Sequence, residues 1–171
     1  MLLIFDLDDT LFERMPDDYS DEDLKKLVLF PYAREILTLR DVKKVLVSKG
    51  DAFFQFQKIR RLGVESLFDA ILIAATDEGK KSCFQQALAQ FPTKDTQDTK
   101  NTQEVWVIGD RVDSEIKYGN ELGLKTVLFR HERGKYKSLV PKSGMEKPMY
   151  VIERFEELRR ILGVEEREER I

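Results

Sequence analysis

Two carboxylates follow the first apolar segment of the chain. Leu2-Leu3-Ile4-Phe5 leads directly to Asp6, and Asp8 comes two residues later. Side chains two apart on an extended backbone emerge on the same side, so both carboxylates can face one ligand. A carboxylate such as Asp6 can attack phosphorus and form an acyl phosphate. A carboxyl such as Asp8 can protonate the leaving oxygen and later deprotonate a water, so the pair predicts covalent phosphoryl chemistry.

Hydroxyl, ammonium and carboxylate groups follow the later apolar runs. Ser48 and Lys49 come after the second run, and Lys80 and Lys81 come after the third. The Ser48 hydroxyl and nearby backbone N–H groups can hold phosphoryl oxygens, and either Lys80 or Lys81 can stabilise negative charge. We therefore assign phosphate binding to Ser48, Lys49, Lys80 and Lys81.

Asp110 ends the fourth apolar run and adds a further acid to the set. A carboxylate that attacks a phosphate is repelled by it, and a divalent cation held by Asp6 and Asp110 would relieve that repulsion. Mg²⁺ fits best, because it prefers oxygen ligands and commonly binds through one or two carboxylates together with substrate phosphate.

The elements that must position these residues alternate between short apolar runs and helical patterns. This alternation predicts an α/β fold with a Rossmann-like parallel sheet of five or six strands, flanked by helices. The expected strands are Leu2–Phe5, Val45–Val47, Ala70–Ala74, Val105–Ile108 and Thr126–Phe129, with Tyr150–Ile152 as a sixth. The expected helices are Tyr32–Leu39, Ala52–Leu62, Ser82–Gln90, Ser114–Leu122 and Phe155–Leu162. In such sheets ligands bind beyond the carboxyl ends of the strands, where the candidate residues fall.

Length and composition favour one domain over residues 1–171. Residues 13–29 fall outside the strand and helix rhythm and could form a flap or minimal cap; we call them the flap segment. Residues 93–103 are polar and predict a surface loop, and residues 163–171 form a charged tail.

The charge balance and the start of the chain bear on partners and location. The net charge of -3 and the pI near 5.4 give no footprint for nucleic acid. The apolar run before Asp6 is far shorter than a signal peptide core or a membrane span, which favours a cytoplasmic protein without membrane contact. The sequence does not distinguish a monomer from a homo-oligomer.

Phe5-Asp6-Leu7-Asp8-Asp9-Thr10-Leu11-Phe12 resembles the first motif of the haloacid dehalogenase superfamily almost letter for letter. Ser48, the lysine pair and Asp110 resemble its second, third and fourth motifs, although Lys49 stands where many members carry Asn. The resemblance implies that Asp6 is the nucleophile and Asp8 the general acid and base. It also implies Mg²⁺ bound by Asp6, Asp110 and the backbone carbonyl of Asp8.

Two positions of these motifs have alternatives. For the third motif we favour Lys80 over Lys81, and for the second acid of the fourth motif we favour Asp113 over Glu115, acting behind the metal ligands. The single histidine, His131, falls in a polar loop and is interpreted as a surface residue. Lys58 near the end of a predicted helix is interpreted first as a cation favoured by the helix dipole.

Asp8 separates the reactions known in this superfamily. Dehalogenases lack an acid at that position, because halide leaves without a proton, whereas an alkoxide needs one. The pattern therefore predicts hydrolysis of a phosphate monoester, with a phosphorylated small molecule as substrate. The alternatives are another reaction of the superfamily, such as phosphoryl transfer, and a non-catalytic phosphoacceptor module. Between Ser48 and Lys80 there is room for one helix and one strand only, so any cap is minimal.

Overall fold

The computed structural model describes residues 1–92 and 104–164. The predicted polar loop, residues 93–103, and most of the charged tail, residues 165–171, lie outside the described residues. Among the helices in the described ranges, none is both long and apolar enough to cross a lipid bilayer.

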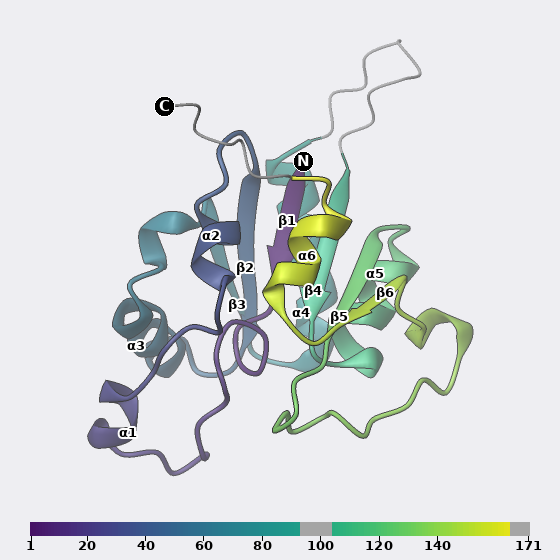
Figure 1. Cartoon of the computed structure of the whole chain (residues 1–171). Coiled ribbons are helices and arrows are strands. Elements are labelled where there is room, and N and C mark those ends of the chain that lie inside the picture. Colours follow the sequence, from purple (N-terminus) through teal and green to yellow (C-terminus); the bar gives the residue numbers. More distant parts are fainter. Residues whose placement is uncertain (93–103, 165–171) are drawn as a thin grey trace.

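Six parallel strands form one sheet in the order β3-β2-β1-β4-β5-β6 (Figure 1). The strands are β1 (Leu2–Phe5), β2 (Lys43–Lys49), β3 (Ala70–Ala74), β4 (Val105–Gly109), β5 (Lys125–Phe129) and β6 (Tyr150–Ile152). β1 lies between β2 and β4 and is buried on both faces, as its continuous apolar run predicts. The predicted Rossmann-like parallel sheet is confirmed, including the sixth strand.

Alternate residues of the sheet enter two separate cores. Leu3 and Phe5 pack with α2 (Ala33–Leu37), α3 (Ala52–Leu62) and α6 (Phe155–Ile161). Leu2 and Ile4 pack on the opposite face against α4 (Asp77–Gln90) and α5 (Lys117–Glu121). Figure 1 shows α2 and α6 on the near face of the sheet. Helices on both faces fix the sheet, and with it the carboxyl ends of its strands.

The remaining helices are short. They are α1 (Asp21–Lys25), the 3₁₀ helices Glu65–Leu67 and Gly144–Glu146, and a π-helical turn Val112–Ile116 that runs into α5. The prediction of one helix over Ser114–Leu122 is therefore replaced by a π turn followed by a short α-helix. The helix predicted from Tyr32 begins one residue later, because Tyr32 has a left-handed backbone (φ 64°).

Candidate active site

The carboxyl ends of β1, β2 and β4 open into a cleft of about 650 Å³. Its floor carries Asp6, Ser48, Lys80 and Asp110, and its walls include residues of the flap segment, the start of α3 and the loop after β5. Figure 1 shows these loops gathered at the lower end of the sheet. The cleft thus brings together the residues predicted from four separate strand ends.

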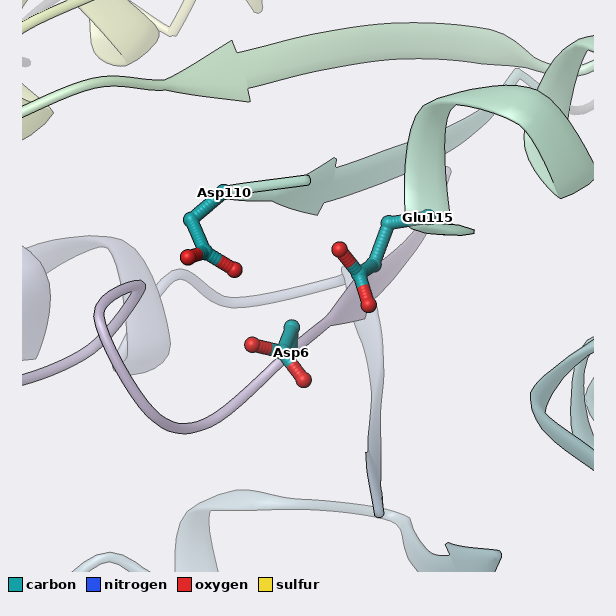
Figure 2. Close-up of side chains that lie close together, drawn as sticks. All are labelled: Asp6, Asp110 and Glu115. Atoms are coloured by element: carbon teal, nitrogen blue, oxygen red, sulfur yellow. The ribbon is translucent and has the colours of Figure 1, made fainter. Parts of the chain in front are cut away.

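Three carboxyl groups converge at the floor of this cleft. Oxygens of Asp6, Asp110 and Glu115 lie within 4.8 Å of one another, and all three side chains are buried. Figure 2 shows them pointing toward a common centre. The Lys80 ammonium lies 2.5 Å from an oxygen of Asp6 and 2.5 Å from an oxygen of Glu115. We call these four residues the buried acid group.

The charges of the buried acid group are not balanced. Burial raises the pKa of Asp110 to about 9, and the neighbouring carboxylates of Glu115, Asp6 and Asp9 add to the rise. Burial likewise raises the pKa of Asp6 to about 7, although Lys80 opposes the shift. No described residue donates a hydrogen bond to the Asp110 carboxylate. Buried oxygens with one ammonium among three carboxyl groups form a donor set that fits a hard cation such as Mg²⁺.

Glu115, rather than Asp113, is the second acid brought to this centre. Asp113 pairs with Arg111 and its side chain is 41% exposed, whereas Glu115 is 1% exposed. The π turn carries Glu115 under the end of β4, where a Cβ on Gly109 would lie 2.5 Å from the Glu115 Cγ. The backbone N–H of Arg111 donates to Glu115 as well. The preference for Asp113 is therefore wrong in geometry, and Gly109 is the sequence signal that could have indicated the close approach.

The structure also separates the candidate lysines. Lys80 is buried, and Asp6 and Glu115 raise its pKa although burial alone would lower it. Lys81, the next residue, pairs with Glu121 on the outer side of α4. Lys49 lines the cleft but pairs with Asp77 at 3.1 Å. Of the three lysines, only Lys80 contacts Asp6.

A second set of side chains joins α3 to the loop after β1. Lys58 donates to one oxygen of Asp8 at 2.8 Å, and Gln55 donates to the other at 3.1 Å. Gln55 also donates to the Ser48 hydroxyl at 2.6 Å. We call Asp8, Ser48, Gln55 and Lys58 the α3 group. Sequence reasoning missed Gln55 and interpreted Lys58 by its place near a helix end, because nothing in the pattern indicates which helix face meets Asp8.

Asp9 ties the walls of the cleft to the loop after β1. It has a left-handed backbone (φ 58°), and its buried carboxylate accepts from the backbone N–H groups of Arg14 and Lys135. The His131 Nε2 lies 2.9 Å from the same carboxylate, and the His131 side chain is only 10% exposed. The surface interpretation of His131 is therefore wrong, because contacts with Asp9, Phe30 and Phe129 cover the ring.

The flap segment forms part of the cleft wall. Tyr19 packs edge-on against Phe54 of α3, with ring centroids 6.3 Å apart. Arg61 of α3 donates to the carbonyl oxygens of Leu24 and Lys25 at the end of α1. These contacts hold the segment beside α3, and Arg14 to Tyr19 line the cleft.

Comparison with known proteins agrees with this fold. The HAD-hydrolase-like family model matches residues 79–158. A glyceraldehyde 3-phosphate phosphatase of Methanopyrus kandleri is 29% identical over 144 residues, which cover 80% of this chain and 58% of the relative. The phosphatase of the same name from Pyrococcus furiosus is 31% identical over 151 residues, which cover 81% of this chain and 58% of that relative. The chain thus spans less than two thirds of the length of these relatives.

Solved structures share the fold at low sequence identity. A Bacillus subtilis protein described as a HAD-hydrolase, determined with magnesium bound, superposes with a TM-score of 0.66 at 16% identity, covering 95% of this chain and 98% of that one. A 2-haloacid dehalogenase from Pseudomonas syringae superposes with a TM-score of 0.64 at 15% identity, covering 95% of this chain and 97% of that one.

The sheet order and the acids at the end of β1 define a doubly wound α/β protein with its ligand site at the carboxyl edge. With the family match and these relatives, the chain belongs to the haloacid dehalogenase superfamily.

Proposed function

We propose that the protein hydrolyses a phosphate monoester through an aspartyl-phosphate on Asp6. The observation that carries the proposal is the position of the Asp6 carboxylate. It lies at the floor of an open cleft, within 2.5 Å of the Lys80 ammonium and 3.3 Å of the Thr10 hydroxyl. These two donors orient the carboxylate, and the lysine offsets part of the charge that a phosphate brings.

In the proposed first step an Asp6 oxygen forms a bond to phosphorus while the bond to the substrate alcohol breaks. Asp8 gives its proton to the departing oxygen. In the second step a water gives a proton to Asp8 and attacks phosphorus, which releases inorganic phosphate and restores the Asp6 carboxylate. Ser48 and Lys80 hold the phosphoryl oxygens throughout, while Lys49 lines the entrance.

Asp6 and Asp110 would hold the metal, with the backbone carbonyl of Asp8 as a further ligand and Glu115 beside them. When bound, Mg²⁺ would offset the charge of these carboxylates and polarise the phosphoryl group. The high pKa of Asp110, about 9, supports this assignment, because burial beside other acids makes its ionised form unfavourable until a cation compensates it. The magnesium-bound B. subtilis structure supports the choice of ion.

We propose a phosphorylated small molecule as substrate. The name glyceraldehyde 3-phosphate phosphatase, carried by both relatives, makes a short phosphorylated aldehyde the first compound to assay. We treat residues 1–171 as one domain in which the flap segment serves as a minimal cap, since it lines the cleft beside α3.

A non-catalytic phosphoacceptor module is the weaker alternative. Receiver domains have the strand order 2-1-3-4-5, whereas this sheet has the order 3-2-1-4-5-6 with the paired acids after β1. Phosphoryl transfer to a second substrate is also weaker, because the cleft is open to water and the flap segment that could cap it is short.

The test is turnover of p-nitrophenyl phosphate and glyceraldehyde 3-phosphate by the full chain with Mg²⁺ and with excess chelator. We expect turnover in Mg²⁺, loss of it in chelator, and no turnover of any substrate by Asp6→Asn. Acid-quenched protein should carry covalent phosphate in the wild type and none in Asp6→Asn. Full activity in chelator, or an active Asp6→Asn, would refute the proposal.

A further inference from the structure

Gln55 is a buried polar residue on an otherwise exposed turn of α3. The residues from Ala52 to Phe54 are exposed, whereas Gln55 is 3% exposed. Burial of an amide is unfavourable unless its polar atoms find partners. The buried Gln55 amide must therefore find hydrogen-bond partners within the cleft, and these partners indicate its role.

The Gln55 amide nitrogen lies close to three acceptors, one in the loop after β1 and two at the end of β2. It lies 2.6 Å from the Ser48 Oγ, 2.8 Å from the carbonyl oxygen of Lys49 and 3.1 Å from the Asp8 Oδ2. An amide nitrogen carries two hydrogens, so three acceptors must share them. One side chain thus connects the loop after β1 with the carboxyl end of β2.

The contact with Ser48 determines where the serine hydroxyl can donate. Because the Ser48 oxygen accepts from Gln55, its own hydrogen points elsewhere. Ser48 lines the cleft, so a phosphoryl oxygen there can accept that hydrogen. Without Gln55 the Ser48 hydroxyl could rotate, and its oxygen could accept a hydrogen bond from water in the cleft instead of donating to a phosphoryl oxygen.

The contact with Asp8 is shared with Lys58, one turn further along α3. Gln55 takes one carboxylate oxygen and Lys58 takes the other, and the Lys58 and Asp8 side chains are 12% and 15% exposed. Two donors on one rigid helix fix the plane of the Asp8 carboxyl group. Only Gln55 of the two also contacts Ser48.

We propose that Gln55 is a positioning residue that aligns the phosphate-holding hydroxyl of Ser48 with the proton-transferring carboxyl of Asp8. The proposal rests on the proposed phosphatase function for its kinetic part. The competing explanation is structural: Gln55 packs 3.5 Å from where a Cβ on Gly50 would lie and could simply support that loop, in which φ of Gly50 is 140°. The two explanations differ in what a substitution does to ligand binding.

The experiment compares the wild type with Gln55→Met, which keeps side-chain length and removes the donor. Lys58→Met removes the other donor to Asp8, together with the contact of the Lys58 ammonium with the Tyr19 ring 5.9 Å away, and leaves the Gln55 contact with Ser48 in place. Gln86→Met on the exposed face of α4 is a matched control. Calorimetry gives the dissociation constant of inorganic phosphate in Mg²⁺. Steady-state kinetics on alkyl and aryl phosphates give kcat as a function of the leaving group. Thermal unfolding shows that each variant is folded, and Gln55→Asn, whose shorter amide cannot reach all three acceptors, gives a second substitution.

We expect Gln55→Met to weaken phosphate binding about tenfold, the size of one lost hydrogen bond. It should also slow alkyl phosphates about 10- to 100-fold more than activated aryl phosphates, because only alkyl leaving groups need a well-placed acid. Lys58→Met should show the leaving-group effect while its phosphate dissociation constant stays within about twofold, and Gln86→Met should show neither.

Wild-type phosphate affinity in both Gln55 variants, with equal losses on every substrate, would overturn the proposal and leave a structural role. A wild type that turns over no phosphate ester would instead refute the proposed function. In that case the phosphate dissociation constants alone would still decide whether Gln55 orients Ser48.

Discussion

The buried acid group and the α3 group meet at the end of β1, yet they balance charge differently. In the α3 group one carboxylate, Asp8, meets one ammonium, Lys58, and the pair has solvent at its edge. In the buried acid group three carboxyl groups share the single ammonium of Lys80 behind the protein surface. Burial, together with the neighbouring carboxylates, raises the pKa values of Asp6 and Asp110 to about 7 and about 9.

This difference separates a site that is complete in the protein alone from one that requires a ligand. A balanced pair at the edge of solvent needs no further charge, so its partners gain little from a cation. An unbalanced buried cluster holds carboxyl groups in an unfavourable environment and gains when a cation enters. The comparison therefore assigns metal binding to the buried acid group and substrate protonation to the α3 group, and each assignment can be tested separately.

The largest effect that separates the groups is expected from Asp8→Asn, which keeps the size of the side chain but removes the proton donor and one of the two oxygens that accept from Lys58 and Gln55. Alkyl phosphates should slow on the order of 100- to 10,000-fold, whereas an aryl phosphate with an acidic leaving group should keep most of its first step. Phosphoenzyme should then accumulate after a burst of phenol, because water attack still lacks its base. Rapid-quench measurement of phenol and of trapped phosphoenzyme checks this. Equal slowing of both substrates without a burst would contradict the role of Asp8.

The two lysines should differ in their effect on stability. Lys80→Met leaves buried Asp6 and Glu115 without their ammonium and should cost about 3 to 5 kcal/mol in the free energy of unfolding. Lys58→Met breaks one pair whose side chains are 12% and 15% exposed and should cost less, about 1 to 2 kcal/mol. Urea unfolding in chelator at pH 7 measures both. Similar losses for the two variants would show that the charge comparison is mistaken.

Asp110→Asn should stabilise the protein in chelator and destabilise it, relative to the wild type, in Mg²⁺. In chelator, a carboxyl whose pKa is raised to about 9 contributes stability below about pH 4, and this contribution is lost as the pH rises. The neutral Asn variant should therefore be more stable than the wild type at pH 8, by on the order of 2 kcal/mol, and should show no advantage at pH 4. In Mg²⁺ the wild type gains from binding, and the variant should need at least about tenfold more metal.

Melting curves across pH, with and without Mg²⁺, test this prediction. A matched Asp113→Asn variant provides the control, because the Asp113 carboxylate pairs with Arg111 at the surface. This variant should show neither the gain in stability at pH 8 in chelator nor the increased requirement for Mg²⁺. An Asp110→Asn protein that is less stable than the wild type in chelator at pH 8 would contradict the charge imbalance.

The strands of this fold are readable from sequence where apolar residues run continuously along the chain, and the helices where capping residues bound them. Leu2–Phe5, Ala70–Ala74 and Tyr150–Ile152 match the structure at both ends, as does the helix Ala52–Leu62 between its Asp51 cap and Gly63. Asp6, Ser48 and Asp110 were predictable for the same reason, since each directly follows or ends such a strand.

Other site residues depend on geometry that no local pattern carries. The choice between Asp113 and Glu115 depends on the π-helical turn Val112–Ile116, because its side chains point in directions that differ from those of an α-helix. Gln55 and Lys58 enter the site because α3 packs with one particular face toward Asp8. His131 is covered by Phe30 and Asp9, which are distant from it in the sequence. Each of these depends on tertiary packing rather than on spacing along the sequence.

The smallest effects are expected at the flap segment. Its backbone contacts neither the buried acid group nor the α3 group, but its residues from Arg14 to Tyr19 line the cleft. Replacing residues 15–19 with a shorter Gly-Ser link should change the ratio of kcat/KM between a bulky phosphate ester and p-nitrophenyl phosphate about tenfold, because only a large leaving group reaches the part of the cleft wall that these side chains form. The kcat on the small aryl phosphate should stay within about threefold. Val28→Ser, in the same segment at a position 74% exposed and away from the cleft, is the control. Equal losses on both substrates would show that the segment supports the fold and leaves substrate choice to the α3 group and the strand ends.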